Sequence, residues 1–82
     1  MATFTLEIKT PGKSVFFDRA LRLTAPAADG EIGILPGHAP LATELKAGNL
    51  KIVLETGEIK NIAGSAGFLI VNKNDVSVLM KK

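Results

Sequence analysis

Residues 29–41, with the sequence DGEIGILPGHAPL, contain three glycines, two prolines, two acids and the only histidine of the chain. Glycine weakens helices and strands, while proline removes a backbone donor and fixes φ, so no helix or ordinary strand tolerates this density. The apolar piece Ile32–Leu35 must therefore be a short segment held between turns. We expect the surface that this run presents to be where the chain makes its functional contact.

With 82 residues, the chain is predicted to form one domain, residues 1–82. A chain of this size buries only about 60% of its unfolded surface. Hydrophobic residues make up 46% of the sequence, and with four Phe and no Trp or Tyr the core must be mainly aliphatic. There is no cysteine, so neither a disulfide nor a thiolate metal site supplements that core.

Charge and hydropathy argue against two classes of partner. The net charge is +2, but the ten basic residues are scattered and only Lys81-Lys82 are adjacent. A nucleic-acid surface needs a basic stripe with stacking aromatics, so nucleic-acid binding is not expected. The sequence has no signal-peptide pattern and no apolar run near the roughly 18 residues of a membrane span. It therefore predicts a soluble, cytosolic chain.

Apolar residues alternate with polar ones in several short segments. Phe4, Leu6 and Ile8 alternate with Thr5, Glu7 and Lys9, and residues 50–54 follow the same period of two, which is typical of half-buried strands. Turn signals stand at residues 11–12, 47–49, 56–57 and 72–75. Many short strands separated by turns indicate an all-β sandwich or barrel.

Two regions do not follow this simple pattern. From Ser14 to Ala25 the apolar residues fit either a helical stripe or a strand, and local pattern does not decide between them. The late strands 68–71 and 76–80 are apolar on both faces. In a small sandwich this predicts that the outer face of one sheet also meets a partner.

Chemistry-bearing residues are few. His38 is the only candidate general base or metal ligand at neutral pH, with Glu31 and Asp29 as possible partners. A lone histidine without a second His or Cys is more often a turn or interface residue, so no catalytic residue, metal or cofactor is predicted. Gly12-Lys13-Ser14 matches only the end of a phosphate-binding loop, because the earlier glycine is replaced by Glu7 inside a strand.

The run GEIGILPGHAPL at residues 30–41 resembles the signature of the epsilon subunit of F-type ATP synthases. The segments LKAG at 45–48, GFLIV at 67–71 and VSVL at 76–79 fit the same family, and the resemblance covers nearly the whole chain. It implies a two-layer antiparallel β-sandwich, which we expect to have about ten short strands and to make residues 14–25 a strand. It also implies a non-catalytic rotor subunit that couples transmembrane ion flow to ATP synthesis.

The partners implied by the resemblance are the gamma subunit and the polar loops of the c-ring, which carry an arginine in this family. A peripheral position on the cytoplasmic face of the bacterial inner membrane follows, without insertion into the bilayer. Matched by position, the residues expected toward gamma are Thr10, His38 and Thr43. Those expected toward the c-ring are Ala28, Asp29, Gly30, Glu31, Ile32 and Gly33.

The chain departs from the family pattern at its end. Typical members continue with a two-helix hairpin that inhibits ATP hydrolysis and in some members binds ATP, whereas this sequence stops at Lys82. We do not transfer those two properties to this chain, and the Met-Lys-Lys ending favours a natural terminus over an excised domain.

Two interpretations from other classes remain open at this point. A small carrier or binding module of the lipoyl type needs a modifiable lysine at a tight hairpin tip, for which Lys73 is the nearest candidate. A small enzyme would be centred on His38 and Glu31.

Overall fold

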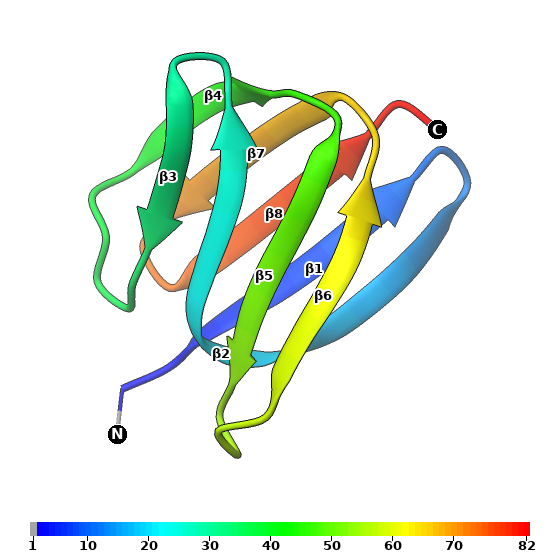
Figure 1. The fold of residues 1–82 in the computed structure, drawn as a ribbon. Coiled ribbons are helices and arrows are strands. Elements are labelled where there is room, and N and C mark those ends of the chain that lie inside the picture. Colours follow the sequence, from blue (N-terminus) through cyan, green and yellow to red (C-terminus); the bar gives the residue numbers. More distant parts are fainter. Residues whose placement is uncertain (1) are drawn as a thin grey trace.

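The computed structural model describes residues 2–82 and contains eight β-strands in this part of the chain (Figure 1). No helix occurs among the described residues, so they include none that could cross a membrane. The strands are β1 Phe4–Thr10, β2 Lys13–Ala27, β3 Gly30–Ile34, β4 Leu41–Leu45, β5 Gly48–Leu54, β6 Ile59–Gly64, β7 Gly67–Asn72 and β8 Asp75–Met80.

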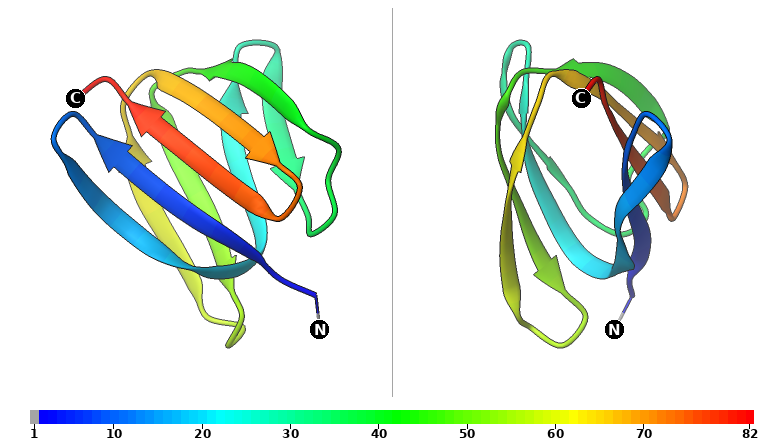
Figure 2. Two further views of the ribbon diagram at one scale, coloured as in Figure 1. Left: turned by 180° about the vertical axis from the view of Figure 1, so that it is seen from behind. Right: turned by 90° about the vertical axis from the view of Figure 1, so that its right-hand side faces the viewer.

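The strands form one hydrogen-bonded sheet that folds over into two layers. The order of neighbouring strands is β1-β8-β7-β4-β2-β5-β6, with β3 also on β2 and an additional pairing of β1 with β2. One layer holds β4, β7, β8 and β1 with the first half of β2, and the other holds β3, the second half of β2, β5 and β6 (Figure 2). The architecture is therefore the expected two-layer β-sandwich.

The long strand β2 joins the two layers. Its first half pairs with β1 as far as Ala20, and from Ala20 onward it pairs with β5. The register shifts between Ala20 and Arg22, and such an irregularity bends a strand and increases its twist. After the shift, Leu23, Ala25 and Ala27 are buried. The strand interpretation of residues 14–25 is thus confirmed, and the helical one is wrong.

Two details of the expected sandwich are corrected. There are eight strands among residues 2–82 where about ten were expected, and one of them, β2, has 15 residues. The pairing is also not purely antiparallel, since β1 and β8 run parallel, with Leu6 beside Val76 and Ile8 beside Val78. The first and last strands of the chain therefore lie side by side in the middle of one layer (Figure 1).

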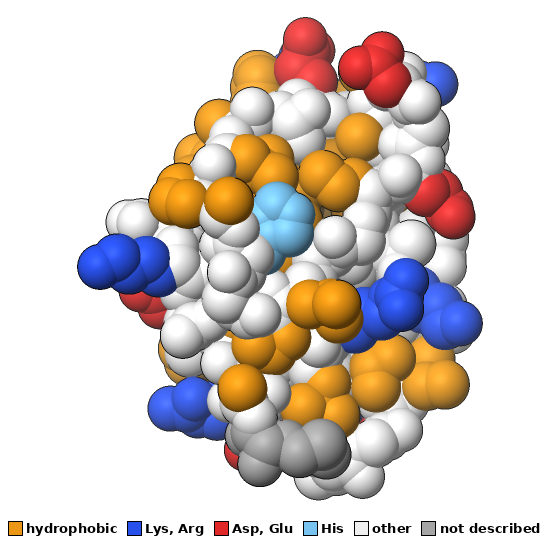
Figure 3. Space-filling view, turned by 90° about the vertical axis from the view of Figure 1, so that its left-hand side faces the viewer, with side chains coloured by type: hydrophobic (Ala, Val, Ile, Leu, Met, Phe, Trp, Pro, Cys, Tyr) orange, Lys and Arg blue, Asp and Glu red, His pale blue; other side chains and the backbone are white. Residues whose placement is uncertain are grey.

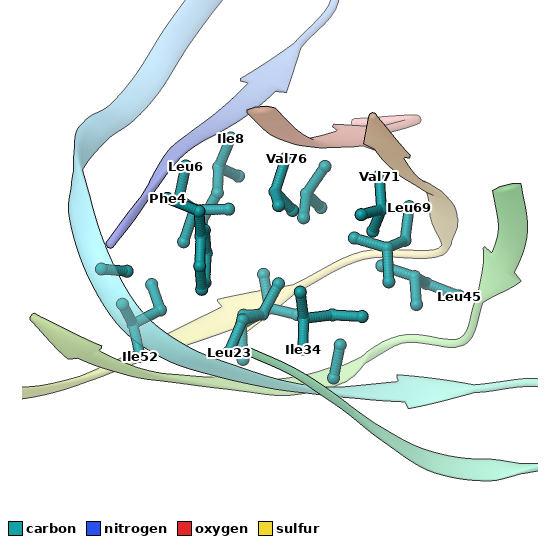
Figure 4. Packing of buried hydrophobic residues seen from close by; sticks show 14 of the residues in the cluster. Phe4, Leu6, Ile8, Leu23, Ile34, Leu45, Ile52, Leu69, Val71 and Val76 are labelled. Atoms are coloured by element: carbon teal, nitrogen blue, oxygen red, sulfur yellow. The ribbon is translucent and has the colours of Figure 1, made fainter. Parts of the chain in front are cut away.

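The core lies between the layers and is built by the alternation seen in the sequence (Figure 4). No polar or charged side chain is buried among the described residues. Inward-facing aliphatic side chains come from both layers, and each fully buried Leu, Ile or Val stabilises the fold by about 1.5–3 kcal/mol. The buried residues are Phe4, Leu6, Ile8, Ala20, Leu23, Ala25, Ala27, Ile34, Leu45, Leu50, Ile52, Leu54, Leu69, Val71, Val76 and Val78.

The turn between β7 and β8 gives a first stability prediction. Lys73 has φ +57°, in the left-handed region that costs most residues about 1–2 kcal/mol and that asparagine tolerates better. We expect Lys73→Asn to raise the free energy of unfolding by about 0.5–1 kcal/mol, measured by urea denaturation. Lys60→Asn, inside strand β6, is the control and should not stabilise the protein. A destabilised Lys73→Asn variant would contradict the strained turn.

Candidate functional site

The glycine- and proline-rich run at residues 29–41 lies almost entirely outside the core. Ile34 is its one fully buried residue, and Ile32 and Leu41 pack at the margin of the core. The remaining residues of the run are exposed or half-buried. Packing in the core therefore does not explain the sequence of this run. An exposed segment of this kind is expected where a protein contacts a partner.

The residues expected toward the c-ring form the tip of the β2–β3 hairpin and the strand that follows it. Ala27 pairs with Gly30, so Ala28 and Asp29 form a two-residue turn. Gly30 has φ +123°, a conformation that glycine adopts without steric cost. Glu31 follows directly, exposed and opposite Pro26. The turn of the β2–β3 hairpin lies at one end of the sandwich (Figure 1), and both acids, Asp29 and Glu31, are exposed.

His38 lies in the connection between β3 and β4, which is fastened to the other layer. The Gly37 N–H donates a hydrogen bond to Asn74 Oδ1 in the β7–β8 turn (2.9 Å), and the His38 N–H donates to the Leu35 carbonyl (3.1 Å). The His38 Nδ1 lies 2.7 Å from the Ala39 carbonyl oxygen. Because a carbonyl only accepts, Nδ1–H must be the donor in this contact. The imidazole is half-buried and held in place.

The structure brings two of the three residues expected toward gamma to the same edge. His38 precedes β4, and Thr43 lies within β4 with its side chain half-buried between the inward positions of Leu41 and Leu45. Hydrophobic side chains gather around the histidine on this edge (Figure 3). Thr10 is at the end of β1, with β8 and β7 between it and β4. Thr10 therefore does not join the other two.

Glu31 and His38 do not form an acid–base pair. The ion pairs among residues 2–82 do not include Glu31 and His38, and the His38 Nδ1 contacts the Ala39 carbonyl oxygen instead. Within residues 2–82 there is also no group of three or more His, Asp or Glu side chains placed to hold a metal ion. In the part of the chain that the structure describes, Glu31 and His38 are thus not in the mutual contact that the enzyme interpretation requires.

The Lys73 position satisfies only one requirement of the carrier interpretation. Asn72 pairs with Asp75, so Lys73 and Asn74 form the tight turn between β7 and β8. However, Asn74 is already used to hold Gly37 and accepts hydrogen bonds through its backbone carbonyl from Thr5. The turn is a structural junction between the β3–β4 connection and β1, and it is not a free tip.

Strands β7 and β8 expose apolar side chains on the outer face of their layer. We call Phe68, Ile70 and Leu79 the apolar face, with exposed fractions of 44%, 40% and 36%. Phe68 pairs with Leu79 across the two strands, and Ile70 is opposite Ala42 of β4. Lys81 Nζ stands 5.9 Å from the centre of the Phe68 ring. The prediction that the late strands are apolar on both faces is confirmed, and the prediction that a partner covers the outer face stays a prediction.

Two hollows flank the β2–β3 hairpin. The first, of about 640 Å³, lies on the outer face of the second layer, and the other, of about 410 Å³, lies between the hairpin turn and β4. The second hollow connects the apolar face to the residues expected toward both partners. It is lined by Ala28, Ala42, Thr43, Glu44 and Phe68. The first is lined by Arg22, Thr24, Pro26, Glu31, Asn49, Lys51 and Val53.

Arg22 and Lys51 are surface residues that the sequence did not single out. The alternation in β2 and β5 leaves both of them exposed, next in sequence to buried residues. Only the pairing of Thr24 with both Lys51 and Gly33 brings the three strands together. A scattered pair of cations in the sequence thus becomes one cluster beside Glu31. No local motif could have found it, because the cluster depends on which strands are neighbours.

Comparison with known proteins identifies a family. The family described as ATP synthase, delta/epsilon chain, β-sandwich domain matches residues 3–82. Among curated relatives, the ATP synthase epsilon chain of Desulforamulus reducens is 47% identical over 77 residues, and that of Chromohalobacter salexigens is 43% identical over 79 residues. The alignments cover 94% and 96% of this chain but only 58% and 56% of those relatives.

Solved structures show the same fold. A chain in the Euglena gracilis mitochondrial ATP synthase, resolved with OSCP, F1 and the c-ring, matches all of this chain with a TM-score of 0.92 at 24% identity, over 52% of its own length. A chain in the central stalk and c-ring of the Tetrahymena thermophila mitochondrial ATP synthase matches 96% of this chain, and 63% of itself, with a TM-score of 0.79 at 22% identity. With a family match that spans residues 3–82 and relatives above 40% identity, the chain belongs to the family of ATP synthase delta/epsilon chain β-sandwich domains.

Proposed function

We propose that residues 1–82 are the domain of an epsilon subunit that joins the gamma subunit to the c-ring in the central stalk of an F-type ATP synthase. In this role the chain turns over no substrate. It transmits torque, so that rotation of the ring driven by ion flow also turns gamma. The position is peripheral, on the cytoplasmic face of a bacterial inner membrane, and is reached through the ring.

The observation that carries this proposal is the exposure of the GEIGILPGHAPL run in a chain of this family. Apart from Ile34, the run contributes little to the core, yet its turns are fixed by Gly30, Gly37 and the hydrogen bond to Asn74. A run that is rigid, exposed and characteristic of the family is suited to contact. The curated relatives are named ATP synthase epsilon chains, which supports the assignment of that contact to the synthase.

We assign the contact with the c-ring to residues 28–33. The tip of the β2–β3 hairpin projects from one end of the sandwich, and Glu31 is exposed there without an ion pair among the described residues. A free carboxylate on a rigid hairpin suits a charge-assisted hydrogen bond to an arginine. Asp29 and the backbone of Gly30 and Gly33 complete the polar edge.

We assign the contact with gamma to the edge formed by His38 and Thr43 together with the apolar face. Phe68 lines the same hollow as Thr43, so these surfaces are continuous. Exposed apolar side chains that adjoin fixed polar groups are typical of lasting interfaces. Thr10 lies on the far side of β7 and β8, so it belongs to this contact only if gamma extends across the whole layer. The two contacts together would bury more than about 1,000 Å².

The interior suits a part that transmits torque. Close-packed interiors deform little, and the two layers here share one continuous sheet through β2 and enclose an entirely apolar core. The β1–β8 pairing also ties both ends of the chain into one layer. Force applied at the hairpin therefore reaches the apolar face through hydrogen-bonded strands.

Glu31→Lys tests the proposed function. The substitution places a lysine where the proposed loop arginine of the c-ring would meet a carboxylate. We expect the affinity of the subunit for the c-ring to fall by about tenfold or more, with a corresponding loss of ATP-driven proton pumping. Because Glu31 is exposed and has no ion pair among residues 2–82, the free energy of unfolding should change by less than about 0.5 kcal/mol. Pumping is measured in reconstituted vesicles and stability by urea denaturation.

Glu55→Lys is the matched control. It makes the same charge change at an exposed residue beyond the end of β5, away from the β2–β3 hairpin tip. Coupling should remain at the wild-type level in this variant. Equal losses of coupling in both variants, or an equal loss of stability and coupling in Glu31→Lys, would contradict the contact at the hairpin tip.

A further inference from the structure

The hollow that Glu31 lines is also lined by two cations that have no ion-pair partner among the described residues. Arg22 on β2 and Lys51 on β5 both line it. The ion pairs among the described residues are Lys9 with Glu7 and Lys60 with Glu58, so neither Arg22 nor Lys51 is paired within residues 2–82. The hollow therefore presents two positive charges and one negative charge to any partner that covers it.

The Arg22 guanidinium reaches over β3 at Gly33, two residues along the strand from Glu31. A Cβ atom placed on Gly33 would lie 3.4 Å from Arg22 Nη2, so the guanidinium lies over β3 at the position where Gly33 has no side chain. Gly33 and Glu31 are neighbours on one face of β3, about 7 Å apart along the strand. Arg22 and Glu31 nevertheless form no ion pair within the described residues.

The hollow also offers uncharged groups that bind anions. Thr24 pairs with Lys51 across β2 and β5, and its hydroxyl lies in the row between Lys51 and Gly33. Asn49 donates through Nδ2 to Asn61 Oδ1 (3.0 Å), which fixes the amides at one side of the hollow. A volume of about 640 Å³ accommodates several side chains of a protein loop.

These observations set a requirement on the partner. A loop that brought only an arginine to Glu31 would place three cations around a single carboxylate. Like charges gathered in one hollow repel one another and lower the affinity for the partner unless an anion offsets them. The surface that covers the hollow must therefore carry a negative group as well as a positive one.

We propose that Arg22 and Lys51 form a second electrostatic contact with the c-ring, and that they bind a carboxylate on the polar loop whose cation pairs with Glu31. This inference rests on the proposed function, because it places the c-ring over the hairpin. It extends the contact from the hairpin tip onto the outer face of β2 and β5. Arginine suits this role because its planar guanidinium binds carboxylates through two parallel hydrogen bonds.

The test measures binding of the chain, assembled with its gamma subunit, to purified c-ring in detergent. We expect Arg22→Glu and Lys51→Glu each to weaken binding by tenfold or more and to leave the thermal unfolding midpoint unchanged. Lys60→Glu makes the same charge change on β6, outside the lining of the hollow, and should bind like the wild type. Replacing the ring's loop carboxylate with arginine should restore the binding of Arg22→Glu.

The outcomes separate the two proposals. If Arg22→Glu and Lys51→Glu bind as tightly as the wild type while Glu31→Lys binds weakly, the carboxylate contact is overturned and the proposed function stands. If Glu31→Lys also binds like the wild type, both the contact and the assignment of the hairpin to the c-ring are overturned. Equal weakening by Lys60→Glu would overturn the site, since it would show dependence on net charge alone.

Discussion

Gly67→Ala is expected to lower the free energy of unfolding by about 2–4 kcal/mol, a large share of the stability of an 82-residue domain. A Cβ atom on Gly67 would overlap the Leu79 carbonyl oxygen and lie 2.9 Å from both the Leu79 carbonyl carbon and Met80 Cα. These are backbone atoms of β8, which cannot move aside as the end of a side chain does. The two strands must separate where Gly67 pairs with Met80, and the pairing of β7 with β4 at Leu45 is disturbed with it.

Gly33→Ala is the matched control for this prediction. Gly33 also lies in a strand, but the nearest atom to an added Cβ is the end of the Arg22 side chain at 3.4 Å. We expect the stability of this variant to stay within about 1 kcal/mol of the wild type. Urea denaturation of both variants measures the difference. A Gly67→Ala protein that unfolds at the wild-type urea concentration would contradict the close approach of β7 and β8.

Gly67→Ala should also affect function, because Gly67 adjoins the apolar face. Gly67 directly precedes Phe68 of the apolar face, and Lys81 bonds through its N–H to the Ala66 carbonyl beside it (3.0 Å). Separation of the strands at this point would tilt Phe68 and Leu79 together. We therefore expect the variant to bind gamma less tightly even at temperatures where it remains folded.

The inward positions of the fold were predictable from sequence. Phe4, Leu6 and Ile8 are all buried, as are Leu50, Ile52 and Leu54, because a period of two fixes which residues share a face. The pairing of strands was not predictable from pattern. The parallel neighbours β1 and β8 are separated by almost the whole chain, and no local signal records which distant segments become partners.

The course of β2 was not predictable from pattern either. Alternation breaks within residues 14–25, so the local pattern fits either a helix or a strand. In the structure the break is the register shift between Ala20 and Arg22, where one strand passes from the first layer to the second. A bulge and a turn produce similar local sequence patterns, so only the tertiary pairing tells them apart.

The candidate site divides in the same way. The exposure of the residue 29–41 run and of the late strands follows from glycine, proline and apolar patterning. The positions of Thr10 and Thr43 on β1 and β4, with two strands between them, depend on topology, as does the cluster of Arg22 and Lys51.

Ile70→Glu is expected to weaken binding to the gamma subunit by about a hundredfold, the largest functional effect that we predict. Ile70 lies within the apolar face, next to Ala42 on β4 and beside the Phe68–Leu79 pair. The substitution would remove the apolar contact of Ile70 with gamma. It would also bury a carboxylate in the interface without a partner. Substitution of a residue at the centre of an interface typically reduces the binding free energy by about 2–4 kcal/mol, and each 1.4 kcal/mol corresponds to a tenfold loss of affinity.

The isolated domain should be nearly unaffected by the same change. The Ile70 side chain is 40% exposed and faces away from the core, so the free energy of unfolding should fall by less than about 1 kcal/mol. Ile59→Glu is the matched control, because Ile59 is also an exposed strand isoleucine but lies on β6 of the other layer. Titration calorimetry with purified gamma measures both affinities. If Ile59→Glu weakens binding as much as Ile70→Glu, gamma does not recognise the β7–β8 layer specifically. If neither variant weakens the affinity for gamma, the apolar face is not the contact, and the binding of gamma must depend on the His38–Thr43 edge alone.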